Sequence, residues 1–309
     1  MFRNKMIKTA GLLLTAILAL SALSGCNSHD YADSDTAILD AQKAVQYIND
    51  PSAVFVDMQD AAAYAEEHVP GAVNISLSDI VVNVPVENTL ASKNKIEKLM
   101  GANGISNDKK IIVYDGTADS LYSSRFWYTM LVYGATDVQV VSGGFDALKR
   151  AGAELTADKA SPQEANYVAG DKNEAIYATL KDIRAQLDNP DPGVVLLDAR
   201  TNDEYMETGK IPTAVIIPHT SNFYTDGTFK NTQTTRINYL NAGIFPEQKV
   251  IIYCRTGVRA SVTFLSLYDA GYRDLMLYDG SFAEWSANPD NPLELPDNAK
   301  VQSSVHDNS

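Results

Sequence analysis

Cysteine is scarce in this sequence, and its scarcity excludes a disulfide framework. The 309 residues include two cysteines, Cys26 and Cys254. We expect Cys26 to be modified in a processed N-terminal segment, which leaves Cys254 without a partner in the chain. An unpaired cysteine in an exported protein indicates a free reactive thiol. The alternative interpretation is a buried and inert cysteine, which is a common state for this residue.

Basic residues are also in the minority. The chain has 25 Lys and Arg against 39 Asp and Glu, a net charge of −14 with a pI near 4.6. This balance excludes nucleic acid and an anionic lipid surface as general partners. It remains compatible with a small anionic substrate, because a local field can oppose the global charge. No group of Cys, His and Asp has the spacing of metal ligands, so we expect no metal and no cofactor.

The hydrophobic run near the N-terminus is too short to span a bilayer. Three basic residues precede an apolar run over residues 10–23, whereas a membrane span needs about 20 apolar residues. The next segment, Leu23-Ser24-Gly25-Cys26, resembles a bacterial lipobox. This resemblance implies cleavage before Cys26, lipid attachment to its sulfur, and an extracytoplasmic protein anchored to a bacterial membrane. The alternative is an ordinary secretory signal peptide.

The rest of the chain contains an internal repeat. Two segments that end in an acid or a cysteine have later counterparts: Ala53-Val54-Phe55-Val56-Asp57 is echoed by Val194-Val195-Leu196-Leu197-Asp198, and Ile111-Ile112-Val113-Tyr114-Asp115 is echoed by Val250-Ile251-Ile252-Tyr253-Cys254. Asp57 and Asp115 are 58 positions apart, and Asp198 and Cys254 are 56 apart. Two long repeats indicate two homologous domains rather than a solenoid. Together with composition shifts, they predict a signal peptide (1–25), a tether (26–35), a first domain (36–155), a linker (156–173), a second domain (174–297) and a polar tail (298–309).

Each repeat alternates short β-branched runs with helical stretches. Val194–Asp198 and Lys249–Tyr253 have the pattern of buried strands, and residues 262–270 that of a helix ended by Gly271. This alternation predicts α/β domains, each with a parallel sheet and helices on both faces. Ligands of such sheets bind beyond the carboxyl ends of the strands. Cys254 lies at one of these ends.

The loop after Cys254 has the chemistry of an anion site. Its backbone N–H groups can converge on the sulfur, or on an atom bound to it, at the start of a helix. Such a site lowers the pKa of a thiol. Gly257 permits a backbone angle that other residues resist. Arg255 and Arg259 favour an anion-binding role, although the alternative is that both are solvated surface charges.

These segments together resemble a tandem-domain rhodanese. The second repeat carries Asp198-Ala199-Arg200, Tyr253-Cys254-Arg255-Thr256-Gly257-Val258-Arg259-Ala260 and Tyr278-Asp279-Gly280-Ser281-Phe282-Ala283-Glu284-Trp285, and the first repeat carries His68-Val69-Pro70-Gly71-Ala72 and Ser124-Arg125-Phe126-Trp127. The resemblance covers residues 37–296. It implies two rhodanese-like domains and an enzyme of the thiosulfate or 3-mercaptopyruvate sulfurtransferase class.

The resemblance also implies a covalent reaction in two steps. Cys254 would take a sulfane sulfur from an anionic donor as a persulfide and pass it to a thiophilic acceptor such as cyanide or a thiol. The active-site loop would comprise Arg255, Thr256, Gly257, Val258 and Arg259. In this scheme Arg255 pairs with Asp198 and fixes the loop, Arg259 faces the substrate, and Arg200 has a supporting role.

Three positions depart from the family pattern. Glu204 stands where the two-domain enzymes have a second substrate-binding arginine, and a carboxylate there would repel a dianionic donor. Thr256 replaces a lysine of the thiosulfate-type loop. Arg259 stands where threonine is usual and could compensate in charge. The use of thiosulfate is therefore left open.

The first repeat has Asp115 at the position of the nucleophile, and its following loop is longer. Because a carboxylate cannot carry persulfide sulfur, we expect a non-catalytic domain that walls the pocket, or alternatively a pure scaffold. His68 is expected to belong to a turn of its own domain. His219 follows a predicted strand and is a weak active-site candidate.

Two other functions remain as alternatives. A rhodanese-like phosphatase or arsenate reductase needs the spacing Cys-x5-Arg, so that the loop is wide enough for a tetrahedral oxyanion. Here Arg259 gives Cys-x4-Arg, one residue less, and the Cys-x5 position is Ala260. This spacing argues against phosphate chemistry. The non-enzymatic alternative is a surface-anchored persulfide-binding or redox-sensing module that uses a free thiol.

Overall fold

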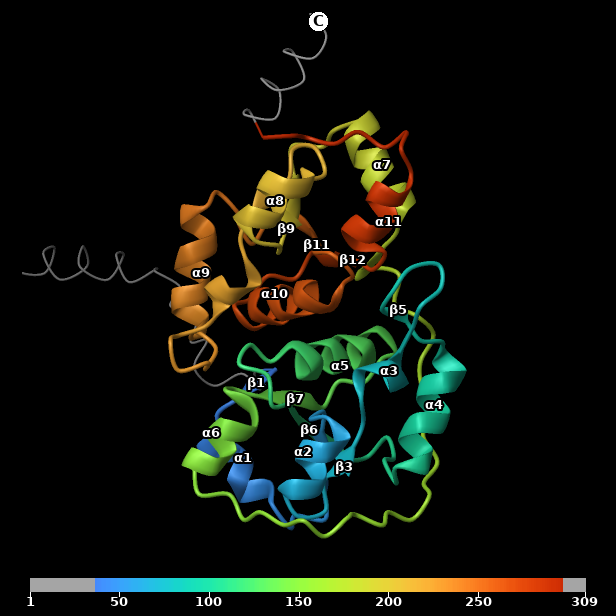
Figure 1. Cartoon of the computed structure of the whole chain (residues 1–309), viewed down its shortest axis with the longest axis vertical. Coiled ribbons are helices and arrows are strands. Elements are labelled where there is room, and N and C mark those ends of the chain that lie inside the picture. The colour runs from blue at the N-terminus through green and yellow to red at the C-terminus, as the bar shows by residue number, and fades with distance from the viewer. Residues whose placement is uncertain (1–36, 297–309) are drawn as a thin grey trace, which may run out of the picture. The chain divides into compact units, whose positions relative to one another are not determined.

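The structure is a computed structural model in which residues 37–296 are described (Figure 1). The expected signal peptide, the tether with the lipidation candidate Cys26, and the polar tail lie outside the described residues. Within residues 37–296, none of the helices combines the length and the apolar character that a bilayer crossing requires.

The first sheet has five parallel strands in the order β1-β7-β6-β2-β3. These are β1 (Ile38–Leu39), β2 (Ala53–Asp57), β3 (Val73–Asn74), β6 (Lys110–Tyr114) and β7 (Val138–Val141). Alternate residues of β6 enter different hydrophobic clusters, so both faces of the sheet are buried. The helices that cover them are α1 (Ala41–Ala44), α2 (Ala61–Glu66), α3 (Leu77–Ile80), α4 (Lys93–Ala102), α5 (Leu121–Val132) and α6 (Gly144–Arg150), with a 3₁₀ turn, η1 (Val45–Tyr47).

The second sheet repeats this topology as β10-β9-β11-β12-β8. Its strands are β8 (Tyr177–Ala178), β9 (Val194–Asp198), β10 (Val215–Ile216), β11 (Lys249–Tyr253) and β12 (Leu275–Tyr278). Its helices are α7 (Leu180–Asp188), α8 (Asn202–Thr208), α9 (Thr232–Asn241), α10 (Val258–Asp269) and α11 (Ser281–Ala287), with a 3₁₀ turn, η2 (His219–Asn222). The prediction of two α/β domains with parallel sheets is confirmed.

Helix α10 begins four residues earlier than the sequence pattern indicates. The physical reason is Gly257, whose φ of +86° turns the chain directly from the loop into the helix. Only glycine adopts such an angle without strain. The loop between Cys254 and α10 is therefore short, and the first turn of α10 includes Arg259.

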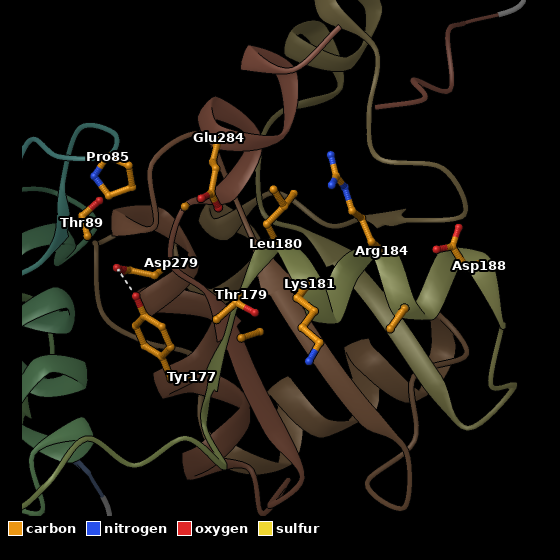
Figure 2. Close-up of a pocket in the computed structure, with 13 residues that line it drawn as sticks. Pro85, Thr89, Tyr177, Thr179, Leu180, Lys181, Arg184, Asp188, Asp279 and Glu284 are labelled. Atoms are coloured by element: carbon orange, nitrogen blue, oxygen red, sulfur yellow. Dashed lines mark hydrogen bonds between the residues drawn. The ribbon is translucent and has the colours of Figure 1, made fainter. Parts of the chain in front are cut away.

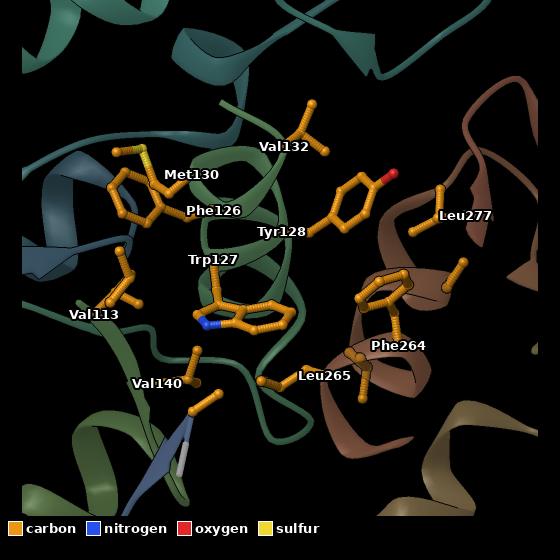
Figure 3. Close-up of a cluster of buried hydrophobic side chains, with 14 of the residues drawn as sticks. Val113, Phe126, Trp127, Tyr128, Met130, Val132, Val140, Phe264, Leu265 and Leu277 are labelled. Carbon is orange, nitrogen blue, oxygen red and sulfur yellow. The ribbon is translucent and has the colours of Figure 1, made fainter. Parts of the chain in front are cut away.

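The two domains share one hydrophobic core, in which α5 packs against α10 (Figure 3). The ring of Phe264 from α10 lies 5.2 Å from Tyr128 and 6.1 Å from Trp127 of α5, measured between ring centroids. Each fully buried side chain of this kind contributes about 1.5–3 kcal/mol. Since α5 and α10 each follow the central strand of a sheet, this contact brings the two repeated loops into one region.

Two further segments join the domains. A hairpin of β4 (Val81–Val82) and β5 (Thr89–Leu90) extends from the first domain toward the second. The linker residues 157–173 have no helix or strand, yet they lie along the first domain. There the amide of Ala165 donates to the carbonyl of Gly101 (2.9 Å), and that of Gly170 to the carbonyl of Tyr133 (2.7 Å).

Candidate active site

Cys254 follows β11 directly and is 1% exposed. The backbone N–H of Gly257 donates to its Sγ at 3.2 Å, and its own N–H donates to the hydroxyl of Ser281 at 3.3 Å. Helix α10 begins at the next residue, Val258, and runs for 12 residues. The sulfur thus lies at the positive end of a helix and accepts a backbone hydrogen bond, an arrangement that favours negative charge on it.

The loop around Cys254 is fixed from two sides. On one side, the amides of Phe282 and Ala283 donate to the carbonyls of Cys254 (3.0 Å) and Arg255 (2.9 Å). On the other side, the amide Nδ2 of Asn88, which belongs to the first domain, donates to Thr256 Oγ1 at 2.9 Å. The first domain therefore contacts the loop of Cys254 directly.

The expected pair between Arg255 and Asp198 is wrong. The carboxylate of Asp198 is bound by Arg200, whose Nε lies 3.0 Å from both oxygens and whose Nη2 lies 2.7 Å from Oδ2. Both partners are buried, whereas Arg255 is exposed. The physical reason is local: Arg200 is two residues from the carboxylate, and its backbone N–H also donates to it at 2.9 Å.

Arg259 and Glu204 form a two-point ion pair next to the loop. The distances are 2.6 Å from Nη1 to Oε2 and 2.8 Å from Nη2 to Oε1. The hydrogen bond from Arg259 lowers the pKa of Glu204 to about 2, against the opposing effect of burial. The same bond raises the pKa of Arg259, to which the nearby Cys254 sulfur also contributes. Arg259 thus offsets the charge of Glu204, which agrees with the compensation considered from the sequence.

A buried ion pair that was not predicted from the sequence joins Arg125 of α5 to Asp279, which follows β12. Arg125 Nη2 lies 2.5 Å from Asp279 Oδ1, and both side chains are at most 2% exposed. The other carboxylate oxygen accepts from the Leu90 amide (2.8 Å) and the Tyr177 hydroxyl (3.1 Å), the latter drawn in Figure 2. Both charged residues lie in motif segments, but nothing in the sequence indicates that they meet.

A cavity of about 550 Å³ adjoins this ion pair (Figure 2). Hairpin residues Pro85 and Thr89 line one side of it, and α7 lines another with Leu180 and Arg184. Asp279 also lines it. The cavity therefore lies where the hairpin of the first domain meets the second domain.

The first domain fills its own anion cradle. The carboxylate of Asp115 accepts hydrogen bonds from the amides of Thr117 (2.8 Å), Tyr122 (3.0 Å) and Ser123 (2.7 Å), and from the Thr117 hydroxyl (2.6 Å). Burial raises the pKa of Asp115, while these hydrogen bonds act in the opposite direction. Helix α5 begins six residues after Asp115, whereas α10 begins four after Cys254, so this loop is longer, as the spacing indicates.

The two histidines considered from the sequence lie elsewhere. His68 interacts through its ring nitrogens with the carbonyls of Tyr64 (2.6 Å) and Asp158 (3.1 Å), around a turn of the first domain. His219 lies in η2, with its Nε2 2.7 Å from Asp119 of the first domain. In residues 37–296, no three His, Cys, Asp or Glu side chains cluster as metal ligands would.

Curated relatives resemble most of the chain. A protein of Saccharopolyspora erythraea provisionally named thiosulfate sulfurtransferase is 29% identical over 82% of this chain and 94% of its own. One of Haloferax volcanii with the same name is 29% identical over 80% and 90%. Among solved structures, the anaerobic ergothioneine biosynthesis enzyme from Chlorobium limicola has a TM-score of 0.73. It is 20% identical, over 84% of this chain and 70% of that one, which shows a shared fold.

A family model identifies the two repeats. The model of the rhodanese-like domain matches residues 40–151 and again residues 179–288. These matches include four of the five strands of each parallel sheet, the Cys254 loop and its Asp115 counterpart. The chain therefore belongs to the rhodanese-like family, in which it is a tandem-domain sulfurtransferase.

Proposed function

We propose that the protein transfers a sulfane sulfur through a persulfide on Cys254. The thiolate attacks the outer sulfur of an anionic donor of the thiosulfate or 3-mercaptopyruvate class. A sulfur–sulfur bond forms to Cys254, and the donor leaves with the electron pair of its broken bond. A thiophilic acceptor, cyanide or a thiol, then attacks the outer sulfur and takes it. The electron pair of the broken sulfur–sulfur bond returns to Cys254, which is a thiolate again. No metal or cofactor takes part in this scheme.

The observation that carries this proposal is the hydrogen bond from the Gly257 amide to Cys254 Sγ at the start of α10. It favours the thiolate, which is the nucleophilic form of cysteine. Arg255 is exposed beside the sulfur, and its charge is available to an approaching anion. Arg259 offers less, because Glu204 already neutralises it.

The test is a persulfide on Cys254. Purified protein without residues 1–26 is mixed with thiosulfate or 3-mercaptopyruvate, and the tryptic peptide 250–255 is weighed by mass spectrometry. We expect one added sulfur, which cyanide then removes. Cys254→Ser should give neither the added mass nor turnover. If several sulfane donors leave this peptide unmodified, the sulfurtransferase mechanism is wrong.

Two alternative outcomes are distinguishable in the same samples. A persulfide that forms but passes to neither cyanide nor a thiol favours a persulfide-binding or redox-sensing module. Hydrolysis of p-nitrophenyl phosphate that depends on Cys254 favours a phosphatase. We expect neither, because the loop of Cys254 is intact and its spacing to Arg259 is short for a phosphate.

We also propose that the protein works outside the cytoplasm, anchored to a bacterial membrane by lipid on Cys26. The support is the N-terminal sequence alone. Cys26→Ser should release the protein from the membrane fraction into the soluble fraction. If the variant stays with the membrane, Cys26 is not the anchor.

A further inference from the structure

The buried ion pair between Arg125 and Asp279 exists around only one of the two repeated sites. Gly134 and Gly143 of the first repeat correspond to Gly271 and Gly280 of the second, an offset of 137 positions in both cases. By the same offset, Arg125 of the first repeat corresponds to Val262 of the second. Asp279 of the second repeat corresponds to Ser142 of the first, so neither charged residue has a charged counterpart.

At Asp279 and at its counterpart Ser142, a backbone amide of the other domain donates a hydrogen bond to the side chain, although only Asp279 is charged. In one half, the Leu90 amide donates to Asp279 Oδ2 at 2.8 Å. In the other half, the Phe229 amide donates to the Ser142 hydroxyl at 3.0 Å. An interdomain contact can thus be made at this position without an ion pair. Of the two equivalent contacts, the one on the side of the thiol carries the ion pair.

Arg125 has hydrogen-bonding capacity that its partners do not use. Its Nη2 donates to Asp279 and to the Asn88 carbonyl (2.7 Å). Within the described residues, its Nε and Nη1 are buried without a partner, and the whole side chain is 0% exposed. Buried polar groups are ordinarily paired, and an exception in a native fold calls for an explanation.

The unpaired Nη1 faces the catalytic loop. A Cβ built on Gly257 would lie 3.2 Å from this nitrogen. Gly257 is also the residue whose amide donates to Cys254 Sγ. The glycine thus leaves the guanidinium room to approach the backbone that holds the sulfur.

The charges of Arg125 and Cys254 interact through this protein interior. Burial acts to lower the pKa of Arg125, but the charge and hydrogen bond of Asp279 outweigh it. The Cys254 sulfur adds a smaller contribution of the same sign, so the pKa of Arg125 is raised. Buried charges are screened far less than exposed ones.

We propose that Arg125 is a positioning residue for the reaction, supplied to the catalytic site by the domain that has no thiol. Its buried charge stabilises negative charge on Cys254 and, after sulfur transfer, on the outer sulfur of the persulfide. Asp279 holds the guanidinium in place and partly offsets its charge. The first domain is then more than a wall or a scaffold.

The experiment measures the rate of alkylation of Cys254 by iodoacetamide against pH, in the full-length protein in detergent. The Cys254 peptide is followed by mass spectrometry. Arg125→Gln should move the midpoint of this profile upward by about one pH unit, since a nearby positive charge is lost. Asp279→Asn should move it downward by a similar amount, because the positive charge is then less offset.

The opposite signs distinguish this role from a structural one. If Arg125 and Asp279 only fastened the domains together, both variants would loosen the loop in the same way. Shifts of the same sign, or no shift in folded protein, overturn the proposal. Tyr177→Phe is the matched control, because it removes a hydrogen bond to Asp279 and leaves both charges in place. We expect its midpoint to stay at the wild-type value.

A poorly folded variant does not leave the question open. If Arg125→Gln does not fold, Arg125→Met takes its place, because methionine is uncharged and packs readily in a buried position. The same upward shift of about one pH unit is expected from it, and an unchanged midpoint contradicts the proposal. If Asp279→Asn does not fold, the Arg125 variants alone decide. Alkylation requires no persulfide, so this result is separate from the proposed sulfur transfer on which the role rests.

Discussion

The guanidinium of Arg259 and the carboxylate of Glu204 meet face to face, with both nitrogens and both oxygens engaged at 2.6 and 2.8 Å. The two residues are 55 positions apart and join the first turn of α10 to the first turn of α8. Because Arg259 is bound to Glu204, its positive charge is less available to an anionic sulfur donor. Donor preference is therefore expected to depend on Glu204 as much as on the loop itself.

Glu204→Gln should improve the use of a dianionic donor. The variant removes the ionic partner of Arg259. The amide oxygen of the substituted side chain can still accept the hydrogen bond that the Thr201 backbone N–H donates at the start of α8. A partly exposed ion pair is worth about 1 kcal/mol, so KM for thiosulfate should fall about fivefold. Steady-state kinetics measure this. Asp203→Asn removes an exposed charge from the same helix and serves as the control; an equal gain there would show a general field effect instead.

Gly257→Ala should impair both folding and turnover. Alanine at φ +86° is strained, and its Cβ would lie 3.1 Å from the Asp279 carbonyl oxygen and 3.2 Å from Arg125 Nη1. Gly152 has φ +82° but no atom within 4 Å of such a Cβ. Gly152→Ala therefore isolates the backbone cost of about 1–2 kcal/mol. We expect a larger loss of unfolding free energy in urea for Gly257→Ala, and a lower kcat only there.

Asp115→Ala should destabilise the first domain without abolishing sulfur transfer. The substitution leaves the amides of Thr117, Tyr122 and Ser123 without their acceptor. Each unsatisfied buried group costs about 1–3 kcal/mol. Unfolding in denaturant should show a lower unfolding free energy for the variant. Its turnover should persist at a temperature at which the variant is folded. Complete loss of turnover in folded protein would contradict a non-catalytic role for this site.

Asp269 should make stability depend on pH. Burial raises its pKa from 3.8 to about 6, against the backbone hydrogen bonds from Ile38 and Ala37 and the charge of Arg273. The folded state therefore holds the proton more tightly than the unfolded state. This contribution, about 3 kcal/mol, is fully present below pH 4 and is lost as pH rises through 6.

Asp269→Asn tests this dependence. The variant should gain about 2 kcal/mol over the wild type between pH 4.5 and pH 8, measured as unfolding free energies in urea. Asp188→Asn, which alters an exposed carboxylate at the end of α7, sets the baseline. If the unfolding free energies of Asp269→Asn and of the wild type change with pH in the same way, the Asp269 carboxyl does not contribute to the pH dependence of stability.

Local pattern was enough to predict much of the fold and the thiol. Strands β9 and β11 have the bounds that their β-branched runs indicate, and the duplicated spacing predicts two similar domains. Cys254 could be singled out because it follows a strand directly and a glycine comes three residues later. These features depend on neighbours in the sequence, where pattern and structure are closely linked.

Charge partners could not be predicted in the same way. Asp198 takes its nearest arginine, Arg200, because proximity along the chain outweighs the family analogy. Arg125 meets Asp279 across 154 positions, since two helices from different domains pack together. The start of α10 was also missed, because a glycine at positive φ shortens the loop without any change in hydrophobic pattern.

The contact of α5 with α10 gives the chain the character of a dimer whose subunits have been joined covalently. Equivalent helices of two similar halves meet there, as the same patch of each subunit does in a two-fold symmetric oligomer. The two subunits of a homodimer have the same sequence, whereas two halves of a single chain can differ in sequence. One half has Cys254 after its central strand, whereas the other has Asp115 there and extends Arg125 across the interface. Cleavage within residues 157–173 should accordingly leave two fragments that remain associated, because each would otherwise expose the large apolar face of its helix.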